Sequence, residues 1–540
     1  MRRSEATLPS EFRAYVENKV GAGFECVAAD GSRRDVFAPE LHEHVRGWAA
    51  HLRHAGVQPG DRVALSIDRV DLFVTLFWAC QFVGAVPTTL TPLDRRERVR
   101  EQCDHIRAII AVAEPKLLIL DSPVVAPTEI QFDLAVMRAD VAVSACGMGE
   151  PFDADPNSIA LIQFTSGSTS TPRGCALSHR AVIANARAIL RRGGGHPGDV
   201  NVHWVPLSHD MGLMAAVIAP VCGHHHSIVM HPRRFMLRPL SWIEEMANRS
   251  RVHTSVPNFA LVQALRRANR LSLGPQSLAG VLNVICGAEP IDAAVVRSFF
   301  GAFAAFGLSP DSFQASYGLA EATVMVASRP GGLKTITRSS EEASGSPVGR
   351  TAREYVSVGR PVDGAEVRIV DEAGECLAEE EQGEIELRSH SLMDGYYADD
   401  AATGEKIVNG WLKTGDLGFL RDENLYISGR RGDLIIIGGK NIFAGDLETR
   451  LAQNLDLDAR KIVALSLQGR HGTDELFLVI EAKNHRSDDD IVALASRICQ
   501  QVCGFLPSRV LIRPSGTIPK TTSGKIKRGE VRKLCLEGKL

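Results

Sequence analysis

The chain has 540 residues, which at about 150 residues per domain predicts three to four domain-sized units. Hydrophobic residues make up 44% and charged residues 23%, an ordinary globular composition that argues against a chain dominated by disorder, collagen or coiled coil. The 61 Lys and Arg residues nearly balance the 64 Asp and Glu residues, so the net charge is −3. The global basic footprint of a nucleic-acid binder is therefore absent.

Neither the N-terminus nor the cysteines indicate export. The first residues carry charge but no apolar core of a secretory signal. The longest apolar stretch, Leu72–Val86, contains Gln81 and is shorter than a membrane-spanning helix, so we expect a buried core helix. Eleven cysteines without CxxC pairs favour reduced thiols in a cytoplasmic protein. Cys499 and Cys503 have helical spacing and are expected on the core side of one helix.

Short apolar runs alternate with stretches of helical period along the first 250 residues. The expected strands are Val63–Ile67, Ala108–Val112, Leu117–Leu120 and Ala160–Phe164. The expected helices are Pro39–Ala55, Ser178–Leu190 and Pro239–Arg249. This alternation predicts an α/β architecture with largely parallel sheets.

The pattern changes after residue 330. Residues 331–360 are polar and rich in Gly, Ser and Thr, which predicts a loop or surface insertion. Short strands are expected at Glu366–Asp371, Gly383–Arg388, Leu434–Ile437 and Glu475–Lys483. One helical face follows, formed by Ile491, Leu494, Ile498, Val502 and Phe505. We expect a small α+β C-terminal domain with a hinge near Gly432, because glycine accepts large changes of backbone angle.

A loop of small and hydroxyl residues follows the expected strand at Ala160–Phe164. It comprises Thr165, Ser166, Gly167, Ser168, Thr169, Ser170 and Thr171, and Ser178 is a candidate N-cap beyond it. Backbone N–H groups and hydroxyls of such a loop can surround phosphate oxygens. The sequence has neither the Walker A spacing nor the G-x-G-x-x-G dinucleotide fingerprint. Taken alone, the loop fits a flexible surface segment equally well.

The segment TSGSTSTPRG resembles the signature loop of the adenylate-forming superfamily, which includes acyl-CoA synthetases, nonribosomal-peptide adenylation domains, luciferases and fatty acyl-AMP ligases. Further matches follow in the order of that superfamily: CGAEP at Cys286–Pro290, SYGLAE at Ser316–Glu321, WLKTGD at Trp411–Asp416, Gly429-Arg430 with Asp433, and PKTTSGK at Pro519–Lys525.

The resemblance implies a two-part α/β fold. A large N-terminal body, residues 1–431, is expected to contain several subdomains, mainly parallel sheets, a distorted β-barrel and a polar insertion near 331–356. Residues 432–540 are expected to form a small, mobile α+β domain that carries the catalytic lysine.

The resemblance also implies a reaction: a carboxylate attacks the α-phosphorus of ATP, pyrophosphate leaves, and an acyl-AMP remains. Two anions meet, so positive charge is needed where negative charge develops, and Mg²⁺ and a lysine can supply it. Lys525 is expected at the α-phosphate and carboxylate oxygens, and Glu321 at Mg²⁺. Taken singly, either residue also fits a solvated surface position.

Nucleotide contacts are implied for several motif residues. Tyr317 is expected to stack on adenine, although core packing also fits, while Asp416 would accept hydrogen bonds from both ribose hydroxyls and Arg430 would support the ribose. The remaining contacts implied are Thr165, Ser166, Gly167, Ser168 and Thr169 at the phosphates, and Gly287, Ala288, Glu289, Ser316 and Gly318 towards the adenine.

Histidines raise two further questions. His209 lies in HWVPLSHDMGL, where the superfamily has an aromatic or histidine gate to the acyl site, although a structural role is the ordinary reading of a lone histidine. The consecutive His224, His225 and His226 cannot share one face of a helix or strand, and no carboxylate cluster is near them in sequence, so we do not expect a metal site. The apolar segment Met211–Val221 fits an acyl tunnel or plain core.

The chain most resembles the fatty acyl-AMP ligase branch of the superfamily. The features are HDMGL at His209–Leu213, SYGLAEAT at Ser316–Thr323, PNFA at Pro257–Ala260 and the polar segment near 331–356. In that branch the insertion restrains the C-terminal domain, and the acyl group passes to the phosphopantetheine thiol of an acyl carrier protein, here in trans. An acyl- or aryl-CoA synthetase, activation of a non-fatty acid and a non-catalytic homologue remain alternatives.

Three departures from the superfamily pattern concern the hinge and acceptor steps more than adenylation. Arg173 replaces a common lysine, Ala444 replaces a proline, and Gly432 stands where Asp or Lys is frequent. The basic stretch between Lys520 and Lys533 fits an acidic carrier protein, ATP or a solvated helix face.

Overall fold

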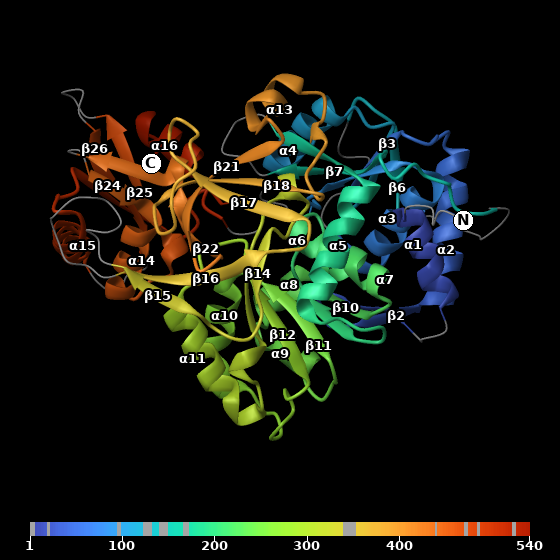
Figure 1. Cartoon of the computed structure of the whole chain (residues 1–540), viewed down its shortest axis with the longest axis horizontal. Helices are drawn as coiled ribbons and strands as arrows, with labels where there is room; N and C mark the ends of the chain where they lie inside the picture. The colour runs from blue at the N-terminus through green and yellow to red at the C-terminus, as the bar shows by residue number, and fades with distance from the viewer. Residues whose placement is uncertain are drawn as a thin grey trace.

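Two large sheets dominate the structure, a computed structural model (Figure 1). It describes residues 6–18, 22–93, 99–122, 132–139, 149–165, 172–338, 353–437, 440–468, 474–482, 487–520 and 525–540. The expected mixed α/β class is confirmed, with parallel strands at the centre of both sheets. Antiparallel strands lie at both ends of the first sheet and at one end of the second, whose other end strand, near residue 136, is parallel to its neighbour.

The first sheet runs from the antiparallel strands of the later chain to the parallel strands of the middle. Its order is β17 (Ala365–Val370), β18 (Gly383–Ser389), β21 (Trp411–Arg421), β22 (Asn424–Arg430), β16 (Arg353–Pro361), β14 (Ala327–Arg329), β13 (Phe313–Tyr317), β12 (Val281–Cys286), β11 (Val252–Val256), β9 (Val200–His203), β10 (His226–Met230), β1 (Gly23–Val27) and β2 (Arg33–Phe37). Pairings among the described strands leave this sheet open, so the distorted barrel expected here is instead an antiparallel extension of the sheet.

The second sheet contains the two strands that the expected phosphate loop joins. Its order is β19 (Gly395–Tyr396), β8 (Arg173–Ser178), β7 (Ile159–Thr165), β4 (Val86–Leu90), β3 (Arg62–Ile67), β5 (Leu117–Asp121) and β6 (Val136–Arg138). β7 and β8 form an antiparallel pair in which Thr165 lies opposite Arg173, so these two residues flank the loop.

Helices cover both sheets and join their cores. The early helices are α1 (Leu8–Glu17), α2 (Ala38–His54), α3 (Val70–Val83), α4 (Val99–Ala113) and α5 (His179–Gly193). Later come α8 (Pro232–Leu237), α9 (Leu240–Met246), α10 (Asn258–Leu265), α11 (Ala293–Phe303) and α13 (Asp400–Lys406). The apolar run from Leu72 is the buried helix α3, as expected. One hydrophobic cluster extends from α1 through α3 to the strands of both sheets.

One expected strand is wrong. Ala108–Val112 lies inside α4, where Cys103, Ile106, Ile109 and Ala113 form the buried face at helical spacing. A short apolar run cannot be distinguished from a buried helix segment by its periodicity alone. Ser178 does precede α5, but its hydroxyl makes no capping hydrogen bond.

The C-terminal residues have their own cores. They form β23 (Leu434–Ile437), β24 (Lys440–Phe443), α14 (Ala444–Leu455), β25 (Ile462–Gln468), β26 (Asp474–Glu481), α15 (Asp488–Cys503), β27 (Arg509–Arg513) and α16 (Arg528–Leu536). The sheet β25-β26-β27 carries α14 and α15 on one hydrophobic cluster and α16 on another. Cys499 and Cys503 are buried on one face of α15, as expected. The division at residues 431 and 432 stays a prediction.

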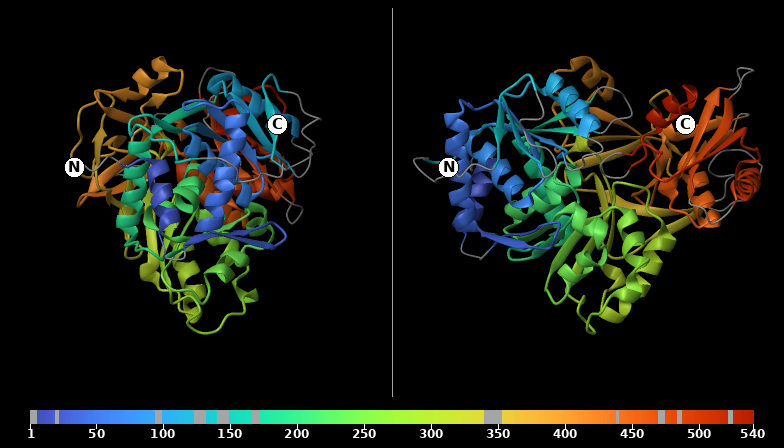
Figure 2. Two further views of the ribbon diagram at one scale, coloured as in Figure 1. Left: turned by 90° about the vertical axis from the view of Figure 1, so that its right-hand side faces the viewer. Right: turned by 180° about the vertical axis from the view of Figure 1, so that it is seen from behind.

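The C-terminal elements and the helices α1 and α2 lie at opposite ends of the molecule (Figures 1 and 2). Contacts with the large body hold the C-terminal elements in place: the Arg353 guanidinium lies 2.5 Å from the Asp446 carboxylate, and the Arg460 guanidinium lies 4.3 Å from the centre of the Phe259 ring. Among the described residues, no helix is long and apolar enough to span a bilayer.

Candidate active site

Asp416 and its partners join the two motifs SYGLAE and WLKTGD. The Tyr317 hydroxyl, at the end of β13, donates to Oδ2 of Asp416 at 2.7 Å. Nε of Arg430 donates to Oδ1 at 2.8 Å, because Asp416 and Arg430 are direct neighbours across β21 and β22. Asp416 is buried, and its own N–H donates to Oγ1 of Thr414 at 3.0 Å. Each carboxylate oxygen retains lone-pair capacity for a further donor, such as a ribose hydroxyl.

Burial and the Asp416 charge determine the protonation of this group. Burial, followed by the Asp416 carboxylate, raises the pKa of Tyr317 well above its usual value, so the hydroxyl stays a donor. The neighbouring Asp416 charge raises the pKa of Arg430, even though that side chain is largely exposed. In this group of three side chains, Tyr317 and Arg430 are therefore the hydrogen-bond donors and Asp416 is the acceptor.

Glu321 lies in the short 3₁₀ turn η7 (Ala320–Ala322), which packs near β7, the strand that ends at Thr165. The Tyr396 hydroxyl, from β19, donates to Oε1 of Glu321 at 2.9 Å, and the Arg173 guanidinium lies 5.4 Å from the centre of the Tyr396 ring. Thr165 ends β7, opposite Arg173. The expected phosphate contacts Ser166, Gly167, Ser168 and Thr169 lie outside the described residues.

Lys525 reaches a small pocket of the large body. It lines this pocket together with Val205, His209, Met211, Pro257, Ala288 and Glu289. The side chain is solvent-accessible, yet protein atoms crowd its amine, and this desolvation lowers the pKa of Lys525, an effect that the nearby Arg430 reinforces and the carboxylates of Asp210, Glu289 and Asp416 oppose. The mixed surroundings leave the ammonium close to several charges of both signs.

His209 faces Lys525 from the start of a helical run formed by α6 (Asp210–Leu213), the π-helical turn η3 (Met214–Ile218) and α7 (Ala219–Gly223). Its Nδ1 lies 2.6 Å from Oδ1 of Asp210, and the Met211 N–H donates to the same oxygen at 2.7 Å. Burial opposes ionisation of Asp210, but His209, Lys525 and this N–H outweigh it and lower the pKa of Asp210. Asp210 thus remains a carboxylate that orients the His209 ring.

The adenine-side motifs meet where β12 and β13 end. Ala288 has a φ of 66°, and Gly287 packs so closely on Ser316 that an added Cβ would lie 2.8 Å from the Ser316 carbonyl oxygen. At Gly318 an added Cβ would lie 1.5 Å from the Val324 carbonyl oxygen, so only glycine fits there. Burial raises the pKa of Glu289, whose Oε1 accepts the Phe259 N–H. The Ser316 hydroxyl donates to the Ala327 carbonyl at 3.3 Å.

The structure brings together Lys525, His209, Ala288 and Glu289 in one pocket, and Tyr317, Asp416 and Arg430 in one hydrogen-bonded group. The described residues contain no cluster of three potential metal-ligating side chains. The histidines after Gly223 diverge: the His224 ring stacks on Tyr15, His225 bonds to Asn201, and His226 lies near Glu25.

Sequence reasoning missed three residues that hold the site. Tyr396 bonds to Glu321 from a segment without a recognised motif, and Arg460 reaches Phe259 from the C-terminal region. Asp210 lies within the quoted HDMGL segment, so its position beside His209 was the available signal. The partners of Tyr396 and Arg460 are distant in sequence, and no local pattern indicates them.

Comparison with known proteins identifies the family. The AMP-binding enzyme family matches residues 25–397. The chain belongs to this family. This AMP-binding enzyme is 30% identical to the long-chain-fatty-acid–AMP ligase FadD26 of Mycobacterium bovis, over 89% of this chain and 88% of the relative. It is also 30% identical to FadD32 of Mycolicibacterium smegmatis, likewise a long-chain-fatty-acid–AMP ligase, over 95% and 90% of the two chains.

A solved structure gives the same picture. The AMP-binding enzyme superposes with a TM-score of 0.86 and 27% identity on a chain from a study of fatty acyl-adenylate ligases of E. coli and L. pneumophila, covering 100% of this chain and 99% of that one. The large body and the C-terminal elements both lie within the match.

Proposed function

We propose that this AMP-binding enzyme activates a carboxylic acid, a fatty acid by likeness to its relatives, with ATP to form an acyl-adenylate and pyrophosphate. The observation that carries the proposal is the meeting of Lys525 with His209 and Glu289 in one pocket. The two relatives named as long-chain-fatty-acid–AMP ligases support the same reaction.

The site residues divide the work of bringing two anions together. Lys525 places its ammonium where the acid carboxylate and the α-phosphate meet, and thereby stabilises the charge that develops in the transition state. Asp416, held by Tyr317 and Arg430, accepts hydrogen bonds from the ribose hydroxyls and fixes the nucleotide. Tyr317 is proposed to stack on the adenine, whose edge would meet the turn at Gly287.

His209 is proposed to lie at the entrance of the site that binds the acid. Nδ1 of His209 lies 2.6 Å from Oδ1 of Asp210, and the His209 ring lines the same pocket as Lys525. The role of His209 is to position the acid, while Asp210 fixes the ring. Thr165 and the four loop residues after it are proposed to line the phosphates.

Glu321 suits a magnesium ion beside the triphosphate. Tyr396 occupies Oε1 of Glu321, and the carboxylate retains Oε2 for a cation. Mg²⁺ is bound in proteins through one or two carboxylates, substrate phosphates and water, so a single glutamate is a sufficient protein ligand. The bound ion would neutralise phosphate charge.

The second half-reaction is proposed to pass the acyl group to the phosphopantetheine thiol of an acyl carrier protein in trans. The alternative acceptor is coenzyme A, as in acyl- or aryl-CoA synthetases. Mass analysis with holo-carrier and coenzyme A offered together separates the two, because efficient release of acyl-CoA would contradict carrier transfer. The ten cysteines in the described ranges form no disulfide with one another, which supports a cytoplasmic location.

Carboxylate-dependent ATP–pyrophosphate exchange tests the first half-reaction. Lys525→Ala is expected to reduce kcat by at least about a hundredfold, as loss of one charge-stabilising group does elsewhere. Lys533→Ala is the matched control, because Lys533 is an exposed lysine of the same region. The proposed adenylation is refuted if no acid in a broad panel supports exchange, or if the Lys525→Ala and Lys533→Ala variants react at equal rates.

A further inference from the structure

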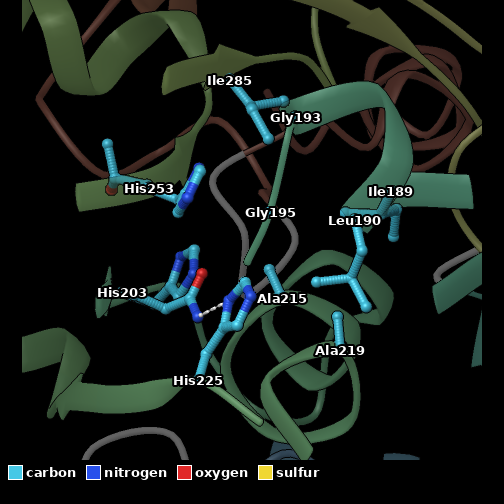
Figure 3. Close-up of a pocket in the computed structure, with 12 residues that line it drawn as sticks. Ile189, Leu190, Gly193, Gly195, His203, Ala215, Ala219, His225, His253 and Ile285 are labelled. Carbon is cyan, nitrogen blue, oxygen red and sulfur yellow. Dashed lines mark hydrogen bonds between the residues drawn. The ribbon is translucent and has the colours of Figure 1, made fainter. Parts of the chain in front are cut away.

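Beyond the Lys525 pocket lies a second small pocket with an uneven lining. The rings of His203, His225 and His253 form one side, and Figure 3 shows Ala215, Ala219 and Leu190 on the other, with Ile285 at one end. The pocket therefore joins an aliphatic wall to a wall of imidazole nitrogens.

The same strands build both pockets. Each of three strands, with the residues directly after it, contributes to both pockets. Pairs that show this, with the residue of the Lys525 pocket first, are Val205 and His203 for β9, Pro257 and Thr254 for β11, and Ala288 and Ile285 for β12. In each pair the residue of the histidine pocket precedes the residue of the Lys525 pocket by two or three positions. The histidine pocket therefore lies towards the N-terminal ends of the same strands, one or two residue pairs away from the Lys525 pocket.

The helical run after His209 also connects the two pockets. Met211 lines the Lys525 pocket, whereas Ala215 and Ala219 line the histidine pocket. Residues four apart share one face of a helix. At a rise of 1.5 Å per residue, Ala215 lies about 6 Å and Ala219 about 12 Å beyond Met211. The histidine pocket is thus where the far end of an acid would lie if its carboxylate meets Lys525.

The hydrogen bonds of His203 determine which of its nitrogens carries the proton. Its Nδ1 accepts the backbone N–H of Ser255 at 3.3 Å, and a backbone N–H can only donate. Burial lowers the pKa of His203 to about 3, so the ring is neutral and its proton is on Nε2. This Nε2 is buried and has no hydrogen-bond partner among the described residues.

His225 repeats the arrangement. Its Nδ1 lies 2.9 Å from Nδ2 of Asn201, an amide nitrogen that donates, and burial lowers the pKa of His225 to about 4. Its Nε2–H is likewise buried without a partner in the part of the chain that the structure describes. His253 differs, because Asp199 and Asn283 occupy both of its ring nitrogens.

Two buried N–H donors without acceptors in one pocket require an explanation, since buried polar groups in proteins are nearly always paired. We propose that the histidine pocket is the far end of the acid-binding site and receives an uncharged oxygen acceptor, a ketone or hydroxyl oxygen, at the chain end of the substrate acid. This inference rests on the proposed function. It assigns an oxygenated acid, rather than a plain alkanoic acid, as the substrate class.

The charges around the pocket favour an uncharged group over a second carboxylate. Arg251, a cation whose charge acts on His225, donates to Asp199 at 2.5 and 3.0 Å and to the Gly194 carbonyl at 3.1 Å, so its charge is already balanced. Neutral imidazole donors suit a carbonyl or hydroxyl oxygen, while the aliphatic wall suits the chain that carries it.

The test is ATP–pyrophosphate exchange with pairs of acids of equal chain length, one ending in a methyl group and the other in a methyl ketone or a hydroxyl, over a series of lengths. At the length that reaches the pocket, kcat/KM of the oxygenated acid is expected to exceed that of the plain acid about tenfold or more, because only the oxygenated acid pairs the buried donors.

Single substitutions identify the donors. His203→Leu and His225→Leu are each expected to lower the ratio of the two kcat/KM values towards one. His179→Leu is the matched control: His179 is also buried and its Nδ1 also accepts a backbone N–H, from Leu8 at 3.2 Å, but it lies outside the pocket, so the ratio should stay unchanged.

The outcomes separate this inference from the proposed function. Exchange that is equal or faster with plain acids at every length overturns the histidine-pocket inference alone and means that water fills the pocket. An unchanged ratio in both histidine variants overturns it too. If neither variant folds, the wild-type ratios decide. If none of the acids supports ATP–pyrophosphate exchange, the proposed function is refuted, and this inference is refuted with it.

Discussion

A buried ion pair anchors the segment that follows Lys525, and its removal is the sharpest test of how the C-terminal region holds Lys525 in place. The Arg528 guanidinium donates two hydrogen bonds to the Glu448 carboxylate of α14, one of them 2.6 Å long. Nε of Arg528 lies 3.1 Å from the Asp433 carboxylate. Glu448 is only 4% exposed. Arg528→Met therefore leaves a buried carboxylate that keeps the hydrogen bond from the Ala464 N–H but loses the charge of Arg528.

The expected cost follows from that burial. Breaking a buried pair at one partner typically costs about 3–5 kcal/mol, and the lower part of this range applies because Arg528 keeps some solvent contact. Hydrogen exchange of the α14 amides, read by mass spectrometry in the full chain, is expected to show local opening favoured by about 3 kcal/mol. Adenylation should slow in parallel, since Lys525 precedes this anchor by three residues.

The double variant Arg528→Met with Glu448→Met distinguishes an unpaired charge from lost packing. Removing both partners is expected to recover most of the α14 protection, because no charge then remains buried. Unchanged α14 exchange in Arg528→Met, or a double variant less protected than the single one, would show that the pair does not anchor this region.

Three further predictions address the site and the fold. Tyr317→Phe removes the hydrogen bond to the buried Asp416 and is expected to raise KM for ATP about tenfold with a smaller change in kcat, measured by exchange kinetics at varied ATP; an unchanged KM would contradict the positioning role. Because crowding lowers the pKa of Lys525, adenylation should decline with rising pH before the usual lysine range near 10.5, and Lys525→Arg should move the decline upward in a pH–rate profile. Burial opposes ionisation of Asp199, but hydrogen bonds from Arg251 and His253 outweigh it and lower the pKa of Asp199 below 3.8. The stability that the ionised Asp199 contributes is thus fully present above about pH 4 and is lost as the pH falls through the lower pKa of the folded state. Asp199→Asn should therefore make the stability of the protein depend less on pH in the acid range, as measured by unfolding followed by circular dichroism.

The sequence predicted most elements because the relevant signals are local. The run from Leu72 is apolar on every face, and in the structure it is a helix surrounded by protein. Leu434–Ile437 was expected as a strand and has those bounds. Ala108–Val112 failed because five apolar residues fit either element, and only the wider pattern of Cys103, Ile106 and Ile109 distinguishes the helix.

The site shows the same limit in another form. Motif spacing indicated Lys525, Asp416 and Tyr317 as site residues, but their hydrogen-bond partners come from chain segments far apart. Tyr317 and Asp416 are 99 residues apart and Tyr396 and Glu321 are 75 apart. Such pairs depend on sheet order and register, which a single sequence does not specify.

By itself, then, the sequence determined the α/β class and the family resemblance and indicated Lys525 as the candidate lysine for adenylation, because hydrophobic period and motif chemistry are read along the chain. Only the tertiary structure decided which charges surround Lys525, and that Nε2 of His203 and of His225 has no hydrogen-bond partner among the described residues. The physical reason is that charge and hydrogen-bond partners act through space, over a few ångströms, between residues that the fold alone brings together.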